Sequence, residues 1–176
     1  MHKAFLTPTF FRPSLLRFLG FSGYLKPLDG IKPYRMELLC APGSSRLDKF
    51  WSPLISPALA DEMGAEEGLL FDLASKEYSA LVGDLPPKVR RVTVDFTVAG
   101  VAAPSAKLKQ SRGLFARFFC EGKVGSVEEA RGFDKEGYGC EVVEEVEGGW
   151  RMVFDRSVED SRGGKKGGSK KRKKGE

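Results

Sequence analysis

The sequence predicts a single domain of the α+β class, in which helices and strands mix without the regular rhythm of parallel βαβ units. Three observations support this prediction. Residues 89–98 alternate between apolar and polar side chains, as in a half-buried strand. Residues 106–121 place apolar side chains at helical spacing. Residues 137–155 are typical of a hairpin, with Gly148 and Gly149 in the turn.

The elements expected nearest the start of the chain are short. Residues 14–19 have the pattern of a helix capped by Ser14 and ended by the glycines of residues 20–23. Two prolines soon afterwards prevent a long second helix, so we expect turns that lead into a strand over residues 34–39.

The middle of the chain predicts alternating short elements. Residues 48–63 have helical spacing, but Pro53 and Pro57 predict a broken or restarted helix. Residues 68–75 predict an apolar strand that leads directly into a short helix. A second short helix is expected at the S-x-x-E capping box that begins at Ser126.

Charge is distributed unevenly along the 176 residues. The net charge is +5, but residues 161–176 hold eight basic residues and one acid, which leaves −2 for residues 1–160. Residues 158–176 cannot bury apolar surface, so we expect a disordered tail. Such a tail can anchor nucleic acid, act as a nuclear import signal, or only add solubility.

Composition excludes several classes of protein. With 41% apolar residues and 13 Phe, the body is too hydrophobic for a disordered polymer, and no apolar run is long enough to span a membrane. Three separated cysteines without a CxxC motif favour a reducing compartment with no metal and no cofactor. Because the one histidine is His2, a positioned histidine base is not expected.

Composition also bears on the compartment. Residues 1–28 are basic and contain several Ser and Thr, as in an organelle transit peptide, but they include Pro8 and Pro13 and no cleavage region. Import into an organelle is therefore the less favoured alternative. The KKRKK tail offers import into the nucleus as another.

A candidate phosphate-binding face lies on the predicted helix of residues 106–121. A helical wheel places Lys109, Arg112 and Arg117 opposite the bulky apolar side chains. Gly113 lies among the cations and would let a phosphate approach the backbone. The alternative is a solvated face with Gly113 packed against a neighbouring element, which composition alone favours.

A second candidate is the G-x-x-G turn. The backbone amides of Gly20, Ser22 and Gly23 could hold a phosphate oxygen, with Lys26 close by. The alternative is a turn that needs two glycines for its backbone angles.

A third candidate is a polar cluster. It consists of Asp29, Tyr34, Arg35 and Glu37. Arg35 and Glu37 could form only a surface ion pair, or with Lys109 they could line a cleft that acts on a small phosphorylated or nucleotide substrate. No catalytic residue can be assigned, and the sequence has no P-loop, so we expect a binding protein rather than an enzyme.

Five segments in order resemble the YaaA family of peroxide-stress proteins. They are FSGYLKPLDGIKPYRMEL with KFW, then LASKEY, K-x-x-RG-x-x-x-R, GF-x-x-EGY and a final VF-x-R. The resemblance implies a cytoplasmic protein whose α+β domain contains a helix-hairpin-helix-like element, binds DNA and limits iron-driven oxidative damage to DNA by hydrogen peroxide. Binding through phosphates should be largely independent of base sequence. It implies that Gly20, Gly23, Lys109, Arg112, Gly113 and Arg117 contact phosphates.

The sequence departs from this family at its start. The opening strand with an SPAKTLD-like motif and the helices after it are absent, so the domain is truncated relative to the family. We assign residues 1–13 to an unrelated leader, residues 14–157 to the YaaA-like domain and residues 158–176 to the tail. A domain without its opening elements could also be inactive. The oligomeric state stays open.

Overall fold

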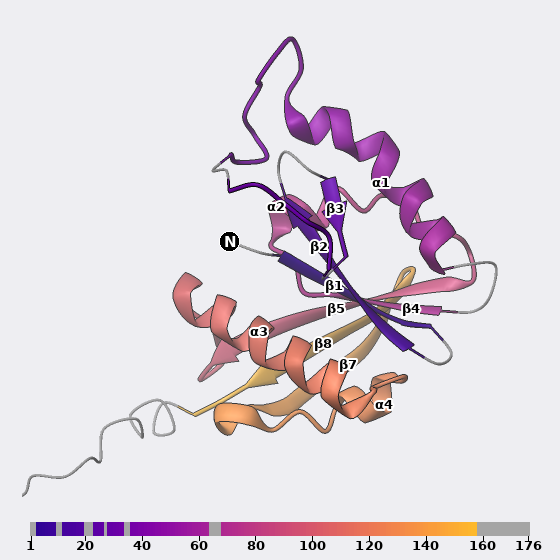
Figure 1. Cartoon of the computed structure of the whole chain (residues 1–176). Helices are drawn as coiled ribbons and strands as arrows, with labels where there is room; N and C mark the ends of the chain where they lie inside the picture. Colours follow the sequence, from indigo (N-terminus) through magenta and orange to yellow (C-terminus); the bar gives the residue numbers. More distant parts are fainter. Residues whose placement is uncertain are drawn as a thin grey trace, which may run out of the picture.

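Eight strands in the described part of the chain form one mixed sheet, as the computed structural model shows (Figure 1). The structure describes residues 3–9, 12–19, 23–26, 28–33, 36–63 and 68–157, the first two ranges as backbone. The sheet order is β3-β2-β1-β4-β5-β8-β7, and β6 pairs with β5 beside this path.

The strands are β1 (Lys3–Thr9), β2 (Arg12–Leu19), β3 (Gly23–Leu25), β4 (Gly68–Asp72), β5 (Val89–Val98), β6 (Val101–Ala102), β7 (Gly139–Val146) and β8 (Gly149–Asp155). The helices are α1 (Leu47–Met63), α2 (Lys76–Ser79), α3 (Ser105–Gly122) and α4 (Val127–Ala130), with a 3-10 turn at Lys135–Gly137. The β4–β5 and β5–β8 pairs are parallel and the other pairs are antiparallel. This mixture agrees with the predicted α+β class.

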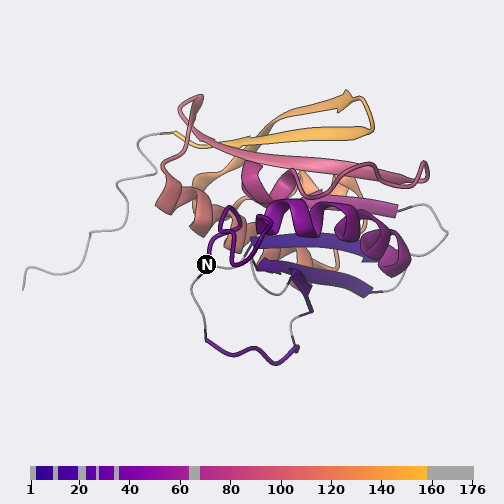
Figure 2. The same cartoon turned by 90° about the horizontal axis from the view of Figure 1, so that it is seen from above.

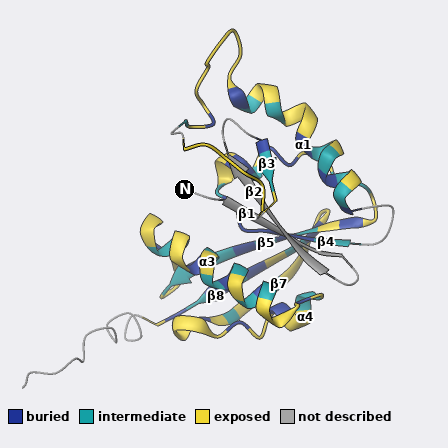
Figure 3. Ribbon diagram, viewed as in Figure 1, coloured by how far each residue is buried: buried dark blue, intermediate teal, exposed yellow. Residues whose placement is uncertain are grey.

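The sheet separates two apolar clusters, because successive side chains of a strand point to opposite faces. Leu70 of β4 joins the cluster under α1 and α2, whereas the next residue, Phe71, joins the cluster under α3 and α4. Figure 3 shows the buried residues of β4 and β5 between these helices. The α3 cluster is rich in phenylalanine, and Phe96 of β5 stacks on Phe154 of β8 with ring centroids 5.8 Å apart.

The other face of β5, β8 and β7 is polar. Arg151 of β8 pairs there with Asp95 of β5 at 3.1 Å and with Glu144 of β7 at 2.9 Å. In Figure 2, β8 and β7 run along one edge of the sheet, and no helix of the described part of the chain lies in front of them. The domain therefore has one sheet face that is covered along β4, β5 and β8 and a second face that is covered only in part.

Several expected elements are confirmed. The strand of residues 89–98 is β5, the helix of residues 106–121 is α3, and the hairpin is β7–β8. Gly148 has a φ of +79° between the paired residues Val146 and Gly149, as a tight turn of this kind requires. Ser126 accepts a bond from the Glu129 amide at 3.1 Å and caps α4.

The helix expected over residues 14–19 is wrong. These residues belong to strand β2, which pairs with β1 along its length and with β3. An apolar run this short fits a helix and a strand equally well, and here the partner strands decide. Because strands lie on both sides of residues 20–23, the described residues do not form the expected helix-hairpin-helix-like element.

Residues 3–9, which fall within the expected leader, form β1 in the middle of the sheet. This strand lies between β2 and β4, and it pairs with β4 at Phe5 and Leu6. The expected tail of residues 158–176 lies outside the described residues.

The strand expected over residues 34–39 is not formed by the described residues 36–39. The backbone there turns, with the Cys40 amide donating to the Glu37 carbonyl at 3.1 Å. The carbonyl of Leu38 accepts from the amide of Asp48, at the start of α1. These backbone groups are therefore used by a turn and a helix start rather than by a strand.

The expected break in residues 48–63 is also wrong, because α1 runs unbroken from Leu47 to Met63. Pro53 and Pro57 lie one turn apart on the exposed side of the helix. Each proline leaves one helix carbonyl without its usual donor, but solvent can reach that side. The buried side keeps its packing through residues such as Ile55 and Leu59.

Candidate nucleic-acid interface

Helix α3 carries the predicted basic face, and its position is fixed by phenylalanines on its inner side. Phe115 and Phe119 are fully buried, and their rings lie 6.3 and 4.9 Å from the ring of Phe71 on β4. Leu114 and Phe118 are half-buried at the margins of this packing. Two such buried rings on one face hold the opposite face of α3 toward solvent.

The predicted contact residues of α3 lie together on the outward side. Lys109, Gly113 and Arg117 are exposed, and Arg112 is half-buried beside them. Arg117 follows Lys109 by eight positions, which corresponds to a rise of about 12 Å along the helix axis. The exposed side of α3 appears in yellow in Figure 3. The three cations therefore share one surface.

Arg112 differs from every other arginine whose side chain the structure describes, because no carboxylate of the described residues lies within ion-pair distance of it. Its Nε is buried and has no hydrogen-bond partner, as is also true of the Nε of Arg156. Burial lowers the pKa of the Arg112 guanidinium, and the charges of Asp72 and Asp95 oppose that shift. Since a guanidinium stays protonated, Arg112 is a partly buried charge without a counter-charge at ion-pair distance among the described residues.

The two flanking cations are more accessible. Lys109 has no ion-pair partner among the described residues. Arg117 donates from Nε to Glu121 at 2.8 Å, one turn further along α3. Both partners of that pair are mostly exposed, so the pair contributes well under about 1 kcal/mol. An anion can therefore compete with Glu121 for Arg117 at small cost.

Gly113 is open to solvent on the same surface. A methyl group added at its Cα would meet no atom within 4 Å. The interpretation in which Gly113 packs against a neighbouring element is therefore wrong. Its conformation is helical, so backbone angles do not require glycine either.

The first half of α3 is anchored by a polar cluster. Ser111 and Tyr138 share a hydrogen bond between their hydroxyls at 2.9 Å, and Gln110 donates to the carboxylate of Glu136. Buried Arg156 lies 5.1 Å above the Tyr138 ring and 3.5 Å from a Glu136 oxygen. Sequence analysis gave these residues no role, although three of them belong to the GF-x-x-EGY and VF-x-R motifs.

The described residues of the predicted G-x-x-G site, Gly23 and Lys26, lie on the side of the sheet that α1 covers. A Cβ at Gly23 would come within 2.8 Å of the Trp51 ring on α1, and Gly23 has a φ of +68°. Lys26 pairs with Glu62 of α1 at 2.8 Å, which raises the pKa of this lysine. The Asp29 carboxylate accepts from the Lys26 amide at 2.8 Å and closes a turn. These described contacts hold the segment against α1 and do not bring it to α3.

The structure leaves the polar cluster of the alternative enzyme incomplete. Four predicted site residues lie outside the described part of the chain: Gly20, Ser22, Tyr34 and Arg35. Glu37 is exposed and precedes Leu38, which is buried in the α1 cluster. Lys109 lies on α3, over the opposite face of the sheet. Glu37 and Lys109 therefore do not line one cleft.

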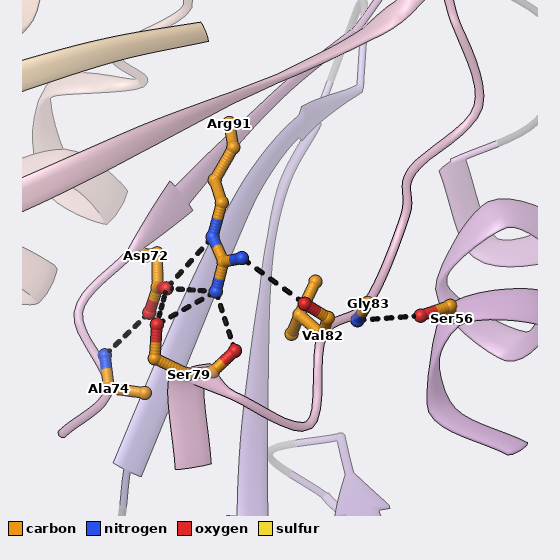
Figure 4. Close-up of polar contacts among 7 residues, drawn as sticks. All are labelled: Ser56, Asp72, Ala74, Ser79, Val82, Gly83 and Arg91. Carbon is orange, nitrogen blue, oxygen red and sulfur yellow. Dashed lines mark hydrogen bonds and ion pairs between the residues drawn. The ribbon is translucent and has the colours of Figure 1, made fainter. Parts of the chain in front are cut away.

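A buried polar cluster that the sequence did not predict joins β4, α2 and β5 (Figure 4). Asp72 accepts from the Ala74 amide at 2.9 Å and from the Ser79 hydroxyl. Arg91 reaches the same carboxylate and also donates to the carbonyls of Ser79 and Val82. Because these groups bind one another, the cluster fixes the LASKEY segment on the sheet. In the sequence, this cluster is indicated only by Asp72, an acidic residue at the end of an otherwise apolar strand.

Two further properties concern the described residues alone. They contain no group of three His, Cys, Asp or Glu side chains placed to hold a metal ion. None of their helices is both long enough and apolar enough to cross a membrane.

Known proteins resemble most of this chain. The family model described as "Peroxide stress protein YaaA" matches residues 9–143. A UPF0246 protein of Rhizorhabdus wittichii is 38% identical over 145 residues, which cover 78% of this chain and 57% of the relative. A UPF0246 protein of Aliivibrio fischeri strain MJ11 is 38% identical over 126 residues, covering 68% and 49%. A UPF0246 protein of Clostridium perfringens strain ATCC 13124 is 33% identical over 159 residues, covering 84% and 60%. The chain therefore spans about half to three fifths of the length of these curated relatives.

Proposed function

Because the chain belongs to the YaaA family of peroxide stress proteins, we propose that it protects DNA against hydrogen peroxide by binding the phosphate backbone through α3. The contact residues are Lys109, Arg112 and Arg117, with Gly113 between them. The proposed compartment is the cytoplasm. The proposal concerns the residues of this chain, which spans only part of its relatives' length.

The observation that supports this proposal is the unpaired guanidinium of Arg112. Among the described arginine side chains, the others have carboxylates to offset their charge, so Arg112 is the one without a counter-charge at ion-pair distance. A phosphate would supply that counter-charge. Arginine suits this role because its planar guanidinium can form two parallel bonds to a phosphate.

The spacing on α3 fits a polyanion better than a single small anion. Lys109 and Arg117 are about 12 Å apart along the helix, and each DNA strand presents a phosphate about every 3.4 Å of duplex axis. Such contacts fix the position of a protein on DNA but do not distinguish base sequences. We therefore expect binding without sequence preference.

Phosphate contacts also give a physical route to protection. Each cationic side chain that contacts a phosphate releases counterions from the DNA. Ferrous ions bound at those phosphates would be released with them. Hydroxyl radicals from iron and peroxide would then form further from the DNA.

Fluorescence anisotropy with two duplexes of unrelated sequence tests the proposal. Replacing Lys109 and Arg112 by Gln should weaken binding to both duplexes about tenfold or more, because each lost charge contact to phosphate contributes at least about 1 kcal/mol. The control is Arg131→Gln on α4, which removes one exposed charge that pairs with Glu128. A second series, with the eight basic tail residues replaced by Gln, separates the tail from α3. Equal affinities for the α3 and control variants in both series would contradict the proposal.

The alternative enzyme is not supported by the described residues. Its cleft requires Glu37 and Lys109 together, and these two residues belong to opposite sides of the sheet.

A further inference from the structure

The outward side of α1 is apolar, which is unusual for a helix that packs its other side on a sheet. The side chains of Phe50 and Leu54 are 53% and 48% exposed, and Pro53 and Pro57 lie exposed between and after them. On a helical wheel, Pro53, Leu54 and Pro57 fall within about 60° of Phe50. Of the residues that α1 buries, Ile55, Leu59 and Met63 lie on the opposite side, whereas Leu47 in the first turn lies at the margin of the outward arc. Figure 1 shows α1 at the periphery of the fold.

Phe50 is held in this outward position by its neighbour. Its ring meets the ring of Trp51 edge to face, with centroids 4.8 Å apart and an angle of 83°. Trp51 in turn lies against Gly23 of β3. The contact with Trp51 therefore stabilises the Phe50 ring in its exposed position.

The apolar stripe ends in opposite charges. Arg46 lies one turn before Phe50, and Asp61 lies one turn after Pro57, both within the same arc of the wheel. Arg46 uses Nε and Nη2 to bind Asp48, at 3.0 and 2.8 Å, which leaves Nη1 for another acceptor. Asp61 is exposed and has no ion pair within the part of the chain that the structure describes.

This stripe is self-complementary about a point midway between Pro53 and Leu54. Residues at equal distances from that point are Arg46 and Asp61 at the ends, then Phe50 and Pro57 inside them. If two copies of α1 pack antiparallel about a two-fold axis at that point, each cation faces an acid of the other copy. Each apolar side chain then faces an apolar side chain. A two-fold contact requires this kind of self-complementary surface.

We propose that this face of α1 is the contact of a homodimer, in which a second copy of the chain packs its α1 antiparallel on the first. A parallel arrangement would place the two Arg46 side chains together and the two Asp61 side chains together, and like charges oppose association. The charge pattern thus selects a second copy and one orientation.

The small area of the apolar stripe limits the affinity of the proposed dimer. Stable interfaces bury about 1,200–2,000 Å² in total, and one helical stripe of about four turns provides less than that. Exposed Leu39 lies close to the start of α1, because the Cys40 carbonyl accepts from the Leu47 amide, and it can extend the contact. We therefore expect a reversible dimer with a Kd on the order of 100 μM.

Sedimentation velocity of the full chain without DNA, from about 5 to 500 μM, tests the proposal independently of the proposed function. The wild type should shift from monomer to dimer over this range. Leu54→Glu should raise Kd more than about tenfold, because it buries a charge at the axis. Val142→Glu, at an exposed position of β7, is the control and should dimerise as the wild type does. Far-UV circular dichroism verifies that each variant is folded.

Charge exchange tests the orientation. Asp61→Arg should weaken the dimer about fivefold or more, because Arg46 of one copy then meets an arginine of the other. Adding Arg46→Asp should restore Kd to within about threefold of the wild type, since the pair is re-formed with reversed signs. A parallel arrangement, which does not bring Arg46 and Asp61 of different copies together, does not predict this restoration.

Cysteine cross-linking gives a second readout. With Cys40, Cys120 and Cys140 replaced by Ala, Leu54→Cys should form a disulfide dimer under mild oxidation, because residue 54 lies next to the axis. Asp61→Cys should not, because it would lie about 22 Å along the helix from its own mate. A chain that stays monomeric to 500 μM, a Leu54→Glu variant that dimerises normally, or equal cross-linking at both positions would overturn the proposal.

Discussion

The carboxylate of Asp72 accepts two bonds from the guanidinium of Arg91, from Nε at 3.0 Å and from Nη2 at 2.6 Å, both at Oδ2. The Asp72 side chain is 1% exposed and that of Arg91 is 26% exposed. The pair connects the end of β4 to its parallel neighbour β5, and Ser79 joins it to α2. These bonds hold three elements of the sheet and its covering layer in one arrangement.

Asp72→Asn should lower the free energy of unfolding by about 3 kcal/mol, because it leaves the mostly buried charge of Arg91 without a counter-charge. Urea denaturation followed by tryptophan fluorescence measures the loss. Asp95→Asn is the matched control, since it removes one acid from the exposed Arg151 pair and should cost less than about 1 kcal/mol. Equal losses in the two variants would show that the buried pair has no special role.

Gly149→Ala should be among the most damaging single substitutions in the sheet. A Cβ at this position would collide with the backbone oxygen of Arg91, which pairs with Gly149 across the parallel β5–β8 ladder. Backbone atoms of a central strand cannot move aside as a flexible side chain can, so we expect a loss of about 2–4 kcal/mol. Thermal unfolding measures it, and a variant with the wild-type Tm would contradict this account of the packing.

Gly113→Ala should have the opposite effect on stability. The position is helical and open, so alanine should add up to about 1 kcal/mol by helix propensity alone. If a phosphate lies against the backbone here, the same substitution should weaken duplex binding while Tm rises. A gain in stability with unchanged binding would remove Gly113 from the proposed contact surface.

Glu121→Gln should strengthen duplex binding about two- to fivefold, because it frees Arg117 from its ion pair and removes one acid near the proposed surface. Glu128→Gln on α4 frees Arg131 in the same way and serves as the control. If both variants change affinity alike, the effect comes from net charge and not from α3.

Elements with a strong local pattern could be predicted from the sequence. β5 alternates between polar and apolar residues from Arg91 to Val98, and α3 repeats its phenylalanines at helical spacing, so local pattern and final structure agree. The run at residues 14–19 has no such preference, and its strand forms only because β1 and β3 lie beside it. Such pairings depend on residues distant in the chain and leave no local signal.

The candidate site, too, could be predicted from the sequence only in part. The cations of α3 could be placed on one face from periodicity, because a helical wheel needs only the residues of one element. Which cation is unpaired could not be predicted, since several arginines pair with acids that come from other elements, as Arg91 does with Asp72. The family motifs marked Glu136, Tyr138 and Arg156, but only the fold brings them together against α3.

The salt dependence of duplex binding tests the central claim most directly. The affinity of the wild type and of Arg112→Gln should be measured from about 50 to 200 mM salt, with Arg131→Gln as the control. If Arg112 contacts a phosphate, the slope of log K against log salt should be about 0.9 shallower in Arg112→Gln than in the wild type, and unchanged in Arg131→Gln. Identical slopes for the wild type and Arg112→Gln would contradict the claim that α3 binds the DNA backbone through this arginine.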